Sequence, residues 1–482
     1  MVPYTTAHKF PLGARLMAVM QLLVMVPFAL MMFLLVLYVT HRFDFTTGHA
    51  YSLIAAFIAL IYGAHVSGGF MAEKFFGHTN AIFLGIILSM VGIFGLLLPG
   101  VITLYISLSF FIVGSGLLIP CLYVLLGRLY ERDNPYRPSG FLFVYVGMNI
   151  GTFIGLALSG PLLQSLGFKY VFVVGGIADI LLLFIFSKYK TVFSDHAVNP
   201  DHSFYRKRDK LLGSVVCLIS IVLIAVLLDY AQVANVALVI IGILCVIFML
   251  FLASKQRGKA RSNMFGFLIL TIVALFFWAL YMLNTSAVII FAEHNVDRHL
   301  FNWTIPTSTF SSLNPVFILI VGIALIYFWN LRYRKTGKSP SIPAKFAIGL
   351  VFAGAAYLLL VFGIHHEVLN KVSIIWVILF YFMMTVAELF IAPVGFSMVG
   401  KLVPMQYEAL MVGVWELSTG IAGALSGYLA YFTISPVRNG NNLVATNLSY
   451  EHSFIIFGII ACSLGVIVAF FVPWLNRLCE SK

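Results

Sequence analysis

Long apolar segments recur along the whole chain, and they leave few folds open to it. A helix needs about 20 apolar residues to cross the hydrocarbon layer of a bilayer. Fourteen segments of roughly this length can be marked, at about 15–40, 52–72, 80–98, 101–130, 140–163, 168–187, 211–230, 235–253, 265–292, 311–333, 344–364, 372–399, 409–433 and 452–474. The polar stretches between them are too short for a soluble domain. The sequence therefore predicts an all-α membrane protein with fourteen transmembrane helices.

The composition favours the same class and excludes others. Hydrophobic residues make up 61% of the 482 residues and charged residues 10%, which is too little charge to cover a soluble protein of this length. The net charge of +12 lies in short runs between apolar segments and not on one basic face. We therefore expect the protein to be embedded in a lipid bilayer and to bind no nucleic acid. The five cysteines form no metal-ligand pattern, and we expect no metal or other cofactor.

Basic residues are concentrated in alternate connections between the apolar segments. Stretches such as 206–210, 254–261 and 332–338 are rich in Lys and Arg, whereas the connections on the other side hold few. Positively charged loops stay in the cytoplasm. This pattern predicts that both termini are cytoplasmic, which agrees with an even number of helices.

Two basic segments divide the chain. The stretches 188–210 and 254–263 flank two short apolar helices with few polar groups. We interpret residues 191–263 as an inserted hairpin between two six-helix bundles, 1–190 and 264–482. Two bundles with a binding site between them near the bilayer midplane are typical of major facilitator transporters, which work by alternating access.

The segment after the second helix supports this fold. It reads GGFMAEKFFG, from Gly68 to Gly77, and resembles the GGxLADRxxG loop of major facilitator transporters. The glycines allow close helix approach and a sharp turn. We expect Gly69, Glu73, Lys74 and Gly77 to form a cytoplasmic gating loop, in which the acid–base pair latches onto neighbouring helix ends.

Three further stretches resemble the proton-dependent oligopeptide transporter family. FLFVYVGMNIGTFIG (141–155) is similar to the family's FYxxINxG signature. Residues 277–315, with NVDR and LNP, resemble its seventh-to-eighth helix segment, and residues 388–427 resemble its tenth and eleventh helices. The six-two-six layout is that of bacterial members. The resemblance implies a protein of the bacterial inner membrane, which we expect to be a monomer, and proton-coupled uptake of di- and tripeptides.

The charged residues that the family carries in its first half are missing. With the register set by residues 37–40, the family's ExxER motif and later arginine fall on Gln21, Val24, Met25 and Met32, and its fourth-helix lysine falls on Ile119. In the family these residues handle the proton and hold the peptide carboxylate. Because a buried charge without its partner is costly, the loss of the whole set together indicates a changed function.

Other polar residues of the family's pocket are retained. The resemblance implies that Glu388 meets the peptide's amino group, that Asn149 holds the peptide backbone and that Asn314 is another polar residue of the pocket. It implies that Tyr62 and Trp415 line the pocket. For the polar residues the alternative is hydrogen bonding between helices, and for the two rings it is simple packing.

Three intramembrane polar residues are unusual for the family. Glu416, His65 and Asp179 could each take up and release a proton in place of the lost relay, or could serve only as interhelical hydrogen-bonding groups. Of these, Glu416 and His65 are the better candidates for proton coupling.

No catalytic motif such as GxSxG, HExxH or a P-loop stands in a suitable context, and we expect no enzyme. We interpret the chain as a secondary transporter of a small peptide-like or amine-bearing solute, with altered or absent proton coupling. Protons remain a candidate partner. The alternatives are a non-transporting sensor or membrane-partner protein with the same fold, and an exporter of drugs or other amphiphiles.

Overall fold

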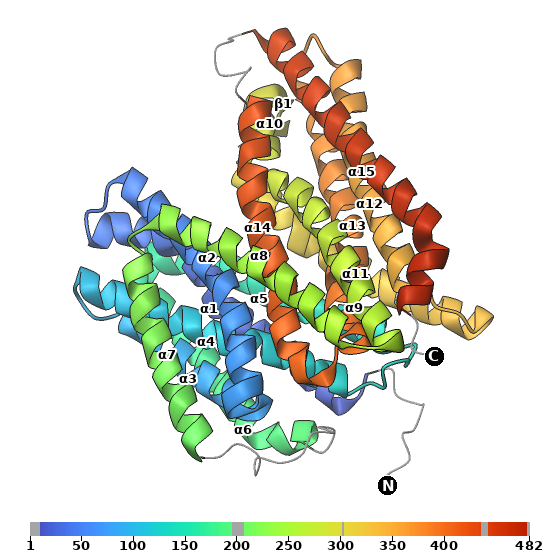
Figure 1. The fold of residues 1–482 in the computed structure, drawn as a ribbon. Helices are drawn as coiled ribbons and strands as arrows, with labels where there is room; N and C mark the ends of the chain where they lie inside the picture. The colour runs from blue at the N-terminus through green and yellow to red at the C-terminus, as the bar shows by residue number, and fades with distance from the viewer. Residues whose placement is uncertain (1–9, 195–206, 301–302, 435–441, 480–482) are drawn as a thin grey trace. The chain divides into compact units, whose positions relative to one another are not determined.

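The computed structural model describes residues 10–194, 207–300, 303–434 and 442–479 (Figure 1). Within these ranges, fourteen helical spans are long and apolar enough to cross a membrane, which confirms the predicted number. The α-helices are α1 (Leu12–Arg42), α2 (Thr47–Met71), α3 (His78–Gly95), α4 (Val101–Arg128), α5 (Arg137–Leu166), α6 (Phe168–Ser194), α7 (Lys207–Leu227), α8 (Ala231–Lys255), α9 (Gly258–Tyr281), α10 (Ala287–Asn295), α11 (Ser308–Thr336), α12 (Ile342–His366), α13 (Ile374–Leu402), α14 (Glu408–Ile434) and α15 (Leu443–Cys479).

Short elements join these helices. A π-helical turn, η1 (Ala72–Phe76), follows α2, and the 3-10 turns η2 (Met282–Thr285) and η3 (Met405–Tyr407) precede α10 and α14. The described part of the chain also contains four strands of two residues each: β1 (Val296–Asp297), β2 (His299–Leu300), β3 (Trp303–Thr304) and β4 (Val372–Ser373). Strand β1 pairs with β4 in parallel, and β2 pairs with β3 antiparallel.

The described residues form two compact units. Unit 1 comprises those of Met1–Ala260 and Phe396–Gly420, and unit 2 comprises those of Arg261–Gly395 and Ile421–Glu480. The boundaries fall inside α13 and α14, so residues 396–402 of α13 and 408–420 of α14 belong to unit 1. The division into 1–190, 191–263 and 264–482 remains a prediction. The linker residues 195–206 and both chain termini lie outside the described residues, so the predicted orientation is untested.

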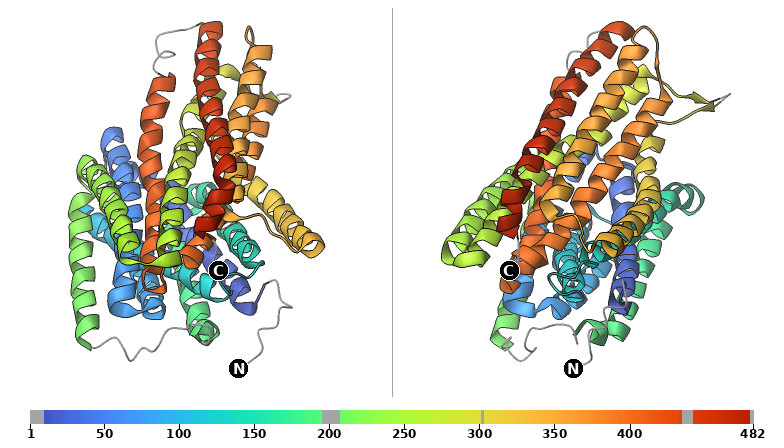
Figure 2. Two further views of the ribbon diagram at one scale, coloured as in Figure 1. Left: turned by 45° about the vertical axis from the view of Figure 1, so that its right-hand side comes forward. Right: turned by 90° about the vertical axis from the view of Figure 1, so that its right-hand side faces the viewer.

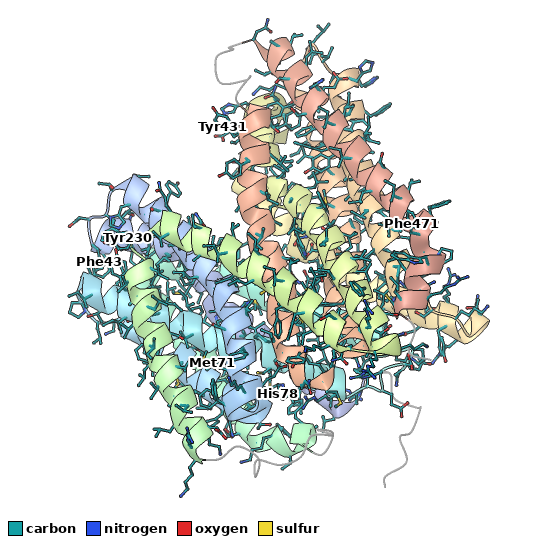
Figure 3. The ribbon with its side chains drawn as sticks, in the orientation of Figure 1. Phe43, Met71, His78, Tyr230, Tyr431 and Phe471 are labelled. Carbon is teal, nitrogen blue, oxygen red and sulfur yellow. The ribbon has the colours of Figure 1, made fainter. Side chains whose placement is uncertain are left out.

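Unit 1 is built on pairs of packed helices. Helix α1 packs against α5 and α6, α3 packs against α4 and α6, and α2 packs against α4. The hairpin helices α7 and α8 pack on α4 and α2. Figure 3 shows Met71 and His78, which flank η1, near one end of this unit, and Phe43 and Tyr230 near the other. The two pairs thus mark its opposite ends.

The turn of the hairpin is tied to the first bundle. The Tyr105 phenol donates a hydrogen bond of 2.8 Å to Asp229 Oδ1, at the connection between α7 and α8. The same carboxylate oxygen is 3.2 Å from His49 Nε2, at the start of α2. These contacts fix the hairpin at one end, although the side chains of His49 and Asp229 are each more than one-third exposed.

In unit 2, α12 and α15 lie side by side in every view (Figure 1 and Figure 2). The predicted single segment 265–292 is interrupted, because η2 separates α9 from α10. Two phenols donate hydrogen bonds to backbone carbonyls at this break. Tyr357 donates to Leu280 O over 2.7 Å, and Tyr381 donates to Asn284 O over 2.8 Å. Side chains from α12 and α13 therefore hold the end of α9 and the turn η2 in place.

Candidate functional site

Glu388 lies on α13 with 3% of its surface exposed. The Tyr281 phenol, at the end of α9, donates a hydrogen bond of 2.9 Å to Glu388 Oε2. The amide of Asn314, on α11, donates to the same oxygen over 2.6 Å and to the Thr385 hydroxyl over 3.1 Å. The structure thus places two of the predicted site residues, Glu388 and Asn314, in direct contact within unit 2.

The chemistry of this cluster suits a cationic partner. A carboxylate can accept about four hydrogen bonds, and the donors from Tyr281 and Asn314 both bond to a single oxygen. Both donors are neutral groups, so they orient the carboxylate and neither of them neutralises it. An ionisable residue inside a membrane-spanning segment is a hypothesis for a functional site. The cluster can therefore receive an amine or ammonium group.

The other three predicted binding residues lie in unit 1. Asn149, on α5, is 7% exposed, and its amide donates to a backbone carbonyl one turn earlier in its own helix over 3.0 Å. The ring of Tyr62 packs edge-on against His65, with 5.9 Å between centroids. Trp415 is fully buried and packs against Phe396 at 6.3 Å. Binding roles for Asn149, Tyr62 and Trp415 remain predictions.

The two candidates for proton coupling come together, although they lie on α2 and α14. His65 Nδ1 is 3.8 Å from Glu416 Oε2, and the side chains are 3% and 18% exposed. On the opposite edge of the imidazole, Nε2 is 3.2 Å from the hydroxyl of Ser115 on α4. An imidazole between a carboxylate and a hydroxyl can take a proton on one nitrogen and release it from the other.

Asp179 belongs to a different pair. It lies on α6, is 1% exposed, and accepts a hydrogen bond of 2.9 Å from the Ser89 hydroxyl on α3. This contact fits the interhelical alternative for Asp179.

The positions at which the resemblance implies lost charges are mostly buried. Gln21, Val24 and Met25 on α1 and Ile119 on α4 are each at most 8% exposed, and Met32 is partly buried. Neither amide atom of Gln21 has a hydrogen-bond partner among the described residues. An isolated charge would be costly at such positions, so neutral side chains there are physically consistent.

The predicted gating loop forms the end of α2 and the turn η1. It stops at Gly77, whose φ of 76° lies in the left-handed region that glycine adopts without strain. Glu73 accepts a hydrogen bond from the backbone N–H of Ala409 at the beginning of α14. The amino end of a helix carries a partial positive charge, which favours this carboxylate.

Lys74 plays a different part from Glu73. It is exposed, and its ammonium lies over the rings of Phe70 and Phe75, 5.1 and 5.5 Å from their centroids. A lysine in this position gains cation–π attraction while its charge stays in water. Of the predicted acid–base pair, the acid makes the contact with α14.

Helices α2 and α14 approach backbone to backbone at two glycines. Gly69 lies against the Ala409 carbonyl, and Gly413 lies against the His65 carbonyl. A Cβ atom at either glycine would overlap these backbone atoms. Small residues permit such close helix contacts in membranes. His65 therefore lies directly at the close contact of α2 with α14, at which the predicted gating loop also contacts α14.

A group of charged residues at the same end of unit 1 was missed by sequence reasoning. Arg128 Nε and Arg132 Nη2 lie 3.6 and 3.7 Å from the two carboxylate oxygens of Glu408. Arg137, 3% exposed, donates to Ser397 O over 3.3 Å. The dense charge of residues 128–137, directly after an apolar helix, was the signal available in the sequence.

Tyr130 lies in the same connection between α4 and α5. Burial raises the pKa of its phenol above the ordinary value, and the nearby Arg137 lowers it to a smaller extent. The phenol therefore stays neutral at physiological pH, and the carbonyl of Tyr130 accepts a hydrogen bond of 3.3 Å from the Arg137 guanidinium. The end of unit 1 at which α4, α5 and α14 meet is thus held by charge-assisted bonds.

Three hydrogen-bonding partners of the predicted site residues were also missed. Thr385 stands three residues before Glu388, a spacing that places both on one helix face, and this could have identified it. Tyr281 lies within the segment 277–315 that carries the resemblance, but nothing in its spacing singles it out. Ser115 has no distinguishing signal, since its role depends on how α2 and α4 pack.

Comparisons with known proteins agree with the fold. A family model described as the POT family matches residues 79–443. The dipeptide and tripeptide permease B of Salmonella typhimurium is 28% identical over 448 residues, which cover 92% of this chain and 91% of that protein. A peptide transporter POT in complex with alafosfalin is 25% identical, covers 98% of this chain and 96% of its own, and gives a TM-score of 0.70. A POT family transporter in complex with 5-aminolevulinic acid is 25% identical, covers 97% of both chains, and gives 0.71.

Proposed function

The chain belongs to the POT family of peptide transporters, and on that premise we propose that it moves a small peptide-like or amine-bearing solute by alternating access, with altered or absent proton coupling. Its homologues are multi-pass membrane transporters and not enzymes. We propose the bacterial inner membrane as its location, with both termini cytoplasmic and a monomer as the working unit. The basic connections between the apolar segments support this orientation.

The observation that carries the proposal is the cluster around Glu388. A buried carboxylate on a membrane-spanning helix, oriented by Tyr281 and Asn314, presents negative charge in an apolar setting. A cationic amine is the natural partner for such a group, because opposite charge and hydrogen bonding act together. The Salmonella relative is named for dipeptides and tripeptides, and one similar structure holds 5-aminolevulinic acid, which also bears an amine.

The protein lacks the charged residues with which the resemblance implies that the family binds a peptide's carboxylate. The positions that the resemblance assigns to charged residues carry Gln21, Val24, Met25, Met32 and Ile119. None of these side chains can form an ion pair. A free carboxylate moved from water to such surroundings loses hydration without compensation. We therefore propose a cargo that lacks a free carboxylate, or one that is more apolar than an ordinary dipeptide.

A matched pair of probes tests this cargo preference. In proteoliposomes at about pH 6, where the terminal amines of both peptides are largely protonated, Ala-Phe amide should enter at least tenfold faster than Ala-Phe. A tenfold difference corresponds to about 1.4 kcal/mol, which is within the cost of one uncompensated polar group. Initial rates with either labelled peptide, corrected with protein-free liposomes, give the ratio. Faster uptake of Ala-Phe, driven by an inward proton gradient, would contradict the altered pocket.

Proton coupling, where it exists, is proposed to use His65 and Glu416. Their 3.8 Å separation is short enough for an ion pair, and Ser115 offers a second contact to the imidazole. The pair adjoins the close contact of α2 with α14 at Gly413. Taking up a proton there changes the charge beside that contact, so protonation and helix separation can be linked.

The Glu416→Gln variant separates coupling from transport. With Ala-Phe amide as the probe, an inward proton gradient should accelerate uptake by the unaltered protein several-fold. In Glu416→Gln the proton gradient should no longer accelerate uptake, whereas counterflow of the same probe continues. Asp179→Asn is the matched control, because Asp179 is also a buried acid in unit 1 but bonds to Ser89. Retention of the gradient response in Glu416→Gln, or its loss in Asp179→Asn, would reject this assignment.

The same measurements discriminate the other functions. Ligand-dependent thermal stabilisation without flux of any probe would replace the carrier proposal with a sensor. Increased sensitivity of a deletion strain to cationic amphiphiles, together with outward flux from inverted vesicles, would indicate an exporter.

A further inference from the structure

A groove outside the proposed transport machinery lies between α3 and α6 of unit 1. Its volume is about 540 Å³. Helix α3 contributes Thr79, Asn80 and Phe83, all within its first two turns. The groove is therefore at the end of the unit marked by His78, next to the turn η1 (Figure 3). On the predicted topology this end faces the cytoplasm.

The lining of the groove changes from polar at the helix ends to aromatic farther along the helices. On α6, Lys190 and Thr191 lie within one turn of the helix end at Ser194, whereas Phe186 lies about two turns from it. On α3, the polar residues Thr79 and Asn80 likewise come first, and Phe83 lies a turn deeper. Polar side chains thus gather at the helix ends, and phenyl rings lie toward the apolar part of both spans.

The charge at the polar end is positive. Lys190 is exposed, and it forms no ion pair with any residue in the described ranges. The first turn of α3 contains no acidic residue, and its N-cap makes no side-chain hydrogen bond, so backbone N–H groups remain to add positive potential. Asn80 donates one amide hydrogen to Phe76 O over 2.9 Å, and its side chain has a second.

We propose that this groove binds an anionic phospholipid of the predicted cytoplasmic leaflet. The lipid phosphate would meet Lys190 and the polar groups of Thr79 and Asn80. An acyl chain would lie over Phe83, whose side chain is 45% exposed. A phospholipid matches both parts of the groove, because its phosphate suits the positive end and its acyl chain suits the apolar part. Free phosphate matches only the positive end. Lipid binding in this groove is independent of which solute the protein carries.

Native mass spectrometry of the detergent-purified protein tests the site. Phosphatidylglycerol and phosphatidylcholine with identical acyl chains are added in separate titrations, and inorganic phosphate is added as a third arm. In Lys190→Gln, bound phosphatidylglycerol should fall about fivefold, the effect expected for one basic residue at an anionic lipid. Lys188→Gln is the matched control, since Lys188 lies over the rings of Phe184 and Tyr189 and does not line the groove.

A second variant keeps the charge and fills the space. Ser187 lines the groove and is exposed, so Ser187→Trp should obstruct it without removing a core side chain. It should reduce phosphatidylglycerol binding as Lys190→Gln does. The proposal is overturned if both variants bind this lipid as the unaltered protein does. It is equally overturned if phosphatidylcholine binds as well as phosphatidylglycerol, or if inorganic phosphate displaces the lipid at comparable concentration.

Discussion

Replacing Glu388 with glutamine is expected to lower uptake of Ala-Phe amide by about ten- to hundredfold. A hydrogen bond to a charged group contributes about 1.5–3 kcal/mol, which corresponds to this range of affinity. The substitution keeps the size of the side chain, removes its charge and replaces one acceptor oxygen with an NH2 group. Because Tyr281 and Asn314 already orient the carboxylate, the loss falls on the incoming ammonium. Initial rates over a range of probe concentrations would show mainly a raised KM.

Matched variants separate binding from simple stability. Glu451→Gln removes another acid of unit 2, whose side chain is 14% exposed and lies 3.2 Å from His365, and should leave uptake nearly unchanged. Tyr281→Phe removes one neutral donor to Glu388, so a smaller loss of about two- to tenfold is expected.

The cargo itself supplies a further control. Uptake of N-acetyl-Ala-Phe amide, which has no ammonium, should respond little to Glu388→Gln. A purely structural role would instead reduce uptake of both probes equally and lower the melting temperature. Unaltered uptake of Ala-Phe amide by Glu388→Gln would remove the central support for the proposed cargo.

The sequence could predict the spans because a bilayer imposes one length and one polarity on every helix. It could not predict the interruption at η2, where Tyr357 and Tyr381 supply donors to backbone carbonyls. Those donors come from other helices, and apolar composition hides the break. The whole stretch Gly258–Asn295 still has the hydropathy of a single span.

The candidate site shows the same limit at the level of single residues. Glu388 could be singled out because an acid inside an apolar helix is conspicuous. Its partners Tyr281 and Thr385 are ordinary residues until α9 and α13 are packed together. His65 and Glu416 could each be proposed separately, but their 3.8 Å contact depends on how α2 and α14 cross. Side-chain chemistry is readable from sequence, whereas the pairing of helices requires the fold.

The Gly413→Val variant is expected to lose transport by at least tenfold while remaining folded. Gly413 lies against the backbone of His65, and a Cβ atom there would overlap the carbonyl group. Overpacking of this kind costs about 1–3 kcal/mol, and about 1.4 kcal/mol already shifts an equilibrium tenfold. In the proposed alternating-access cycle, we expect the close contact of α2 and α14 to belong to one of the exchanging states. The variant should depopulate that state and slow the cycle.

A control on the same helix distinguishes this effect from general damage to α14. A Cβ atom at Gly423 would meet no other atom within 4 Å, so Gly423→Val should transport at close to the unaltered rate. The transport rate of Gly413→Ala should fall between those of the two valine variants, because its single Cβ atom already meets the His65 carbonyl. Loss of uptake with a melting temperature close to that of Gly423→Val would indicate a shifted equilibrium. If Gly413→Val transported normally, the contact of α2 with α14 would have no part in the cycle, and the proposed link between His65, Glu416 and helix separation would lose its physical basis.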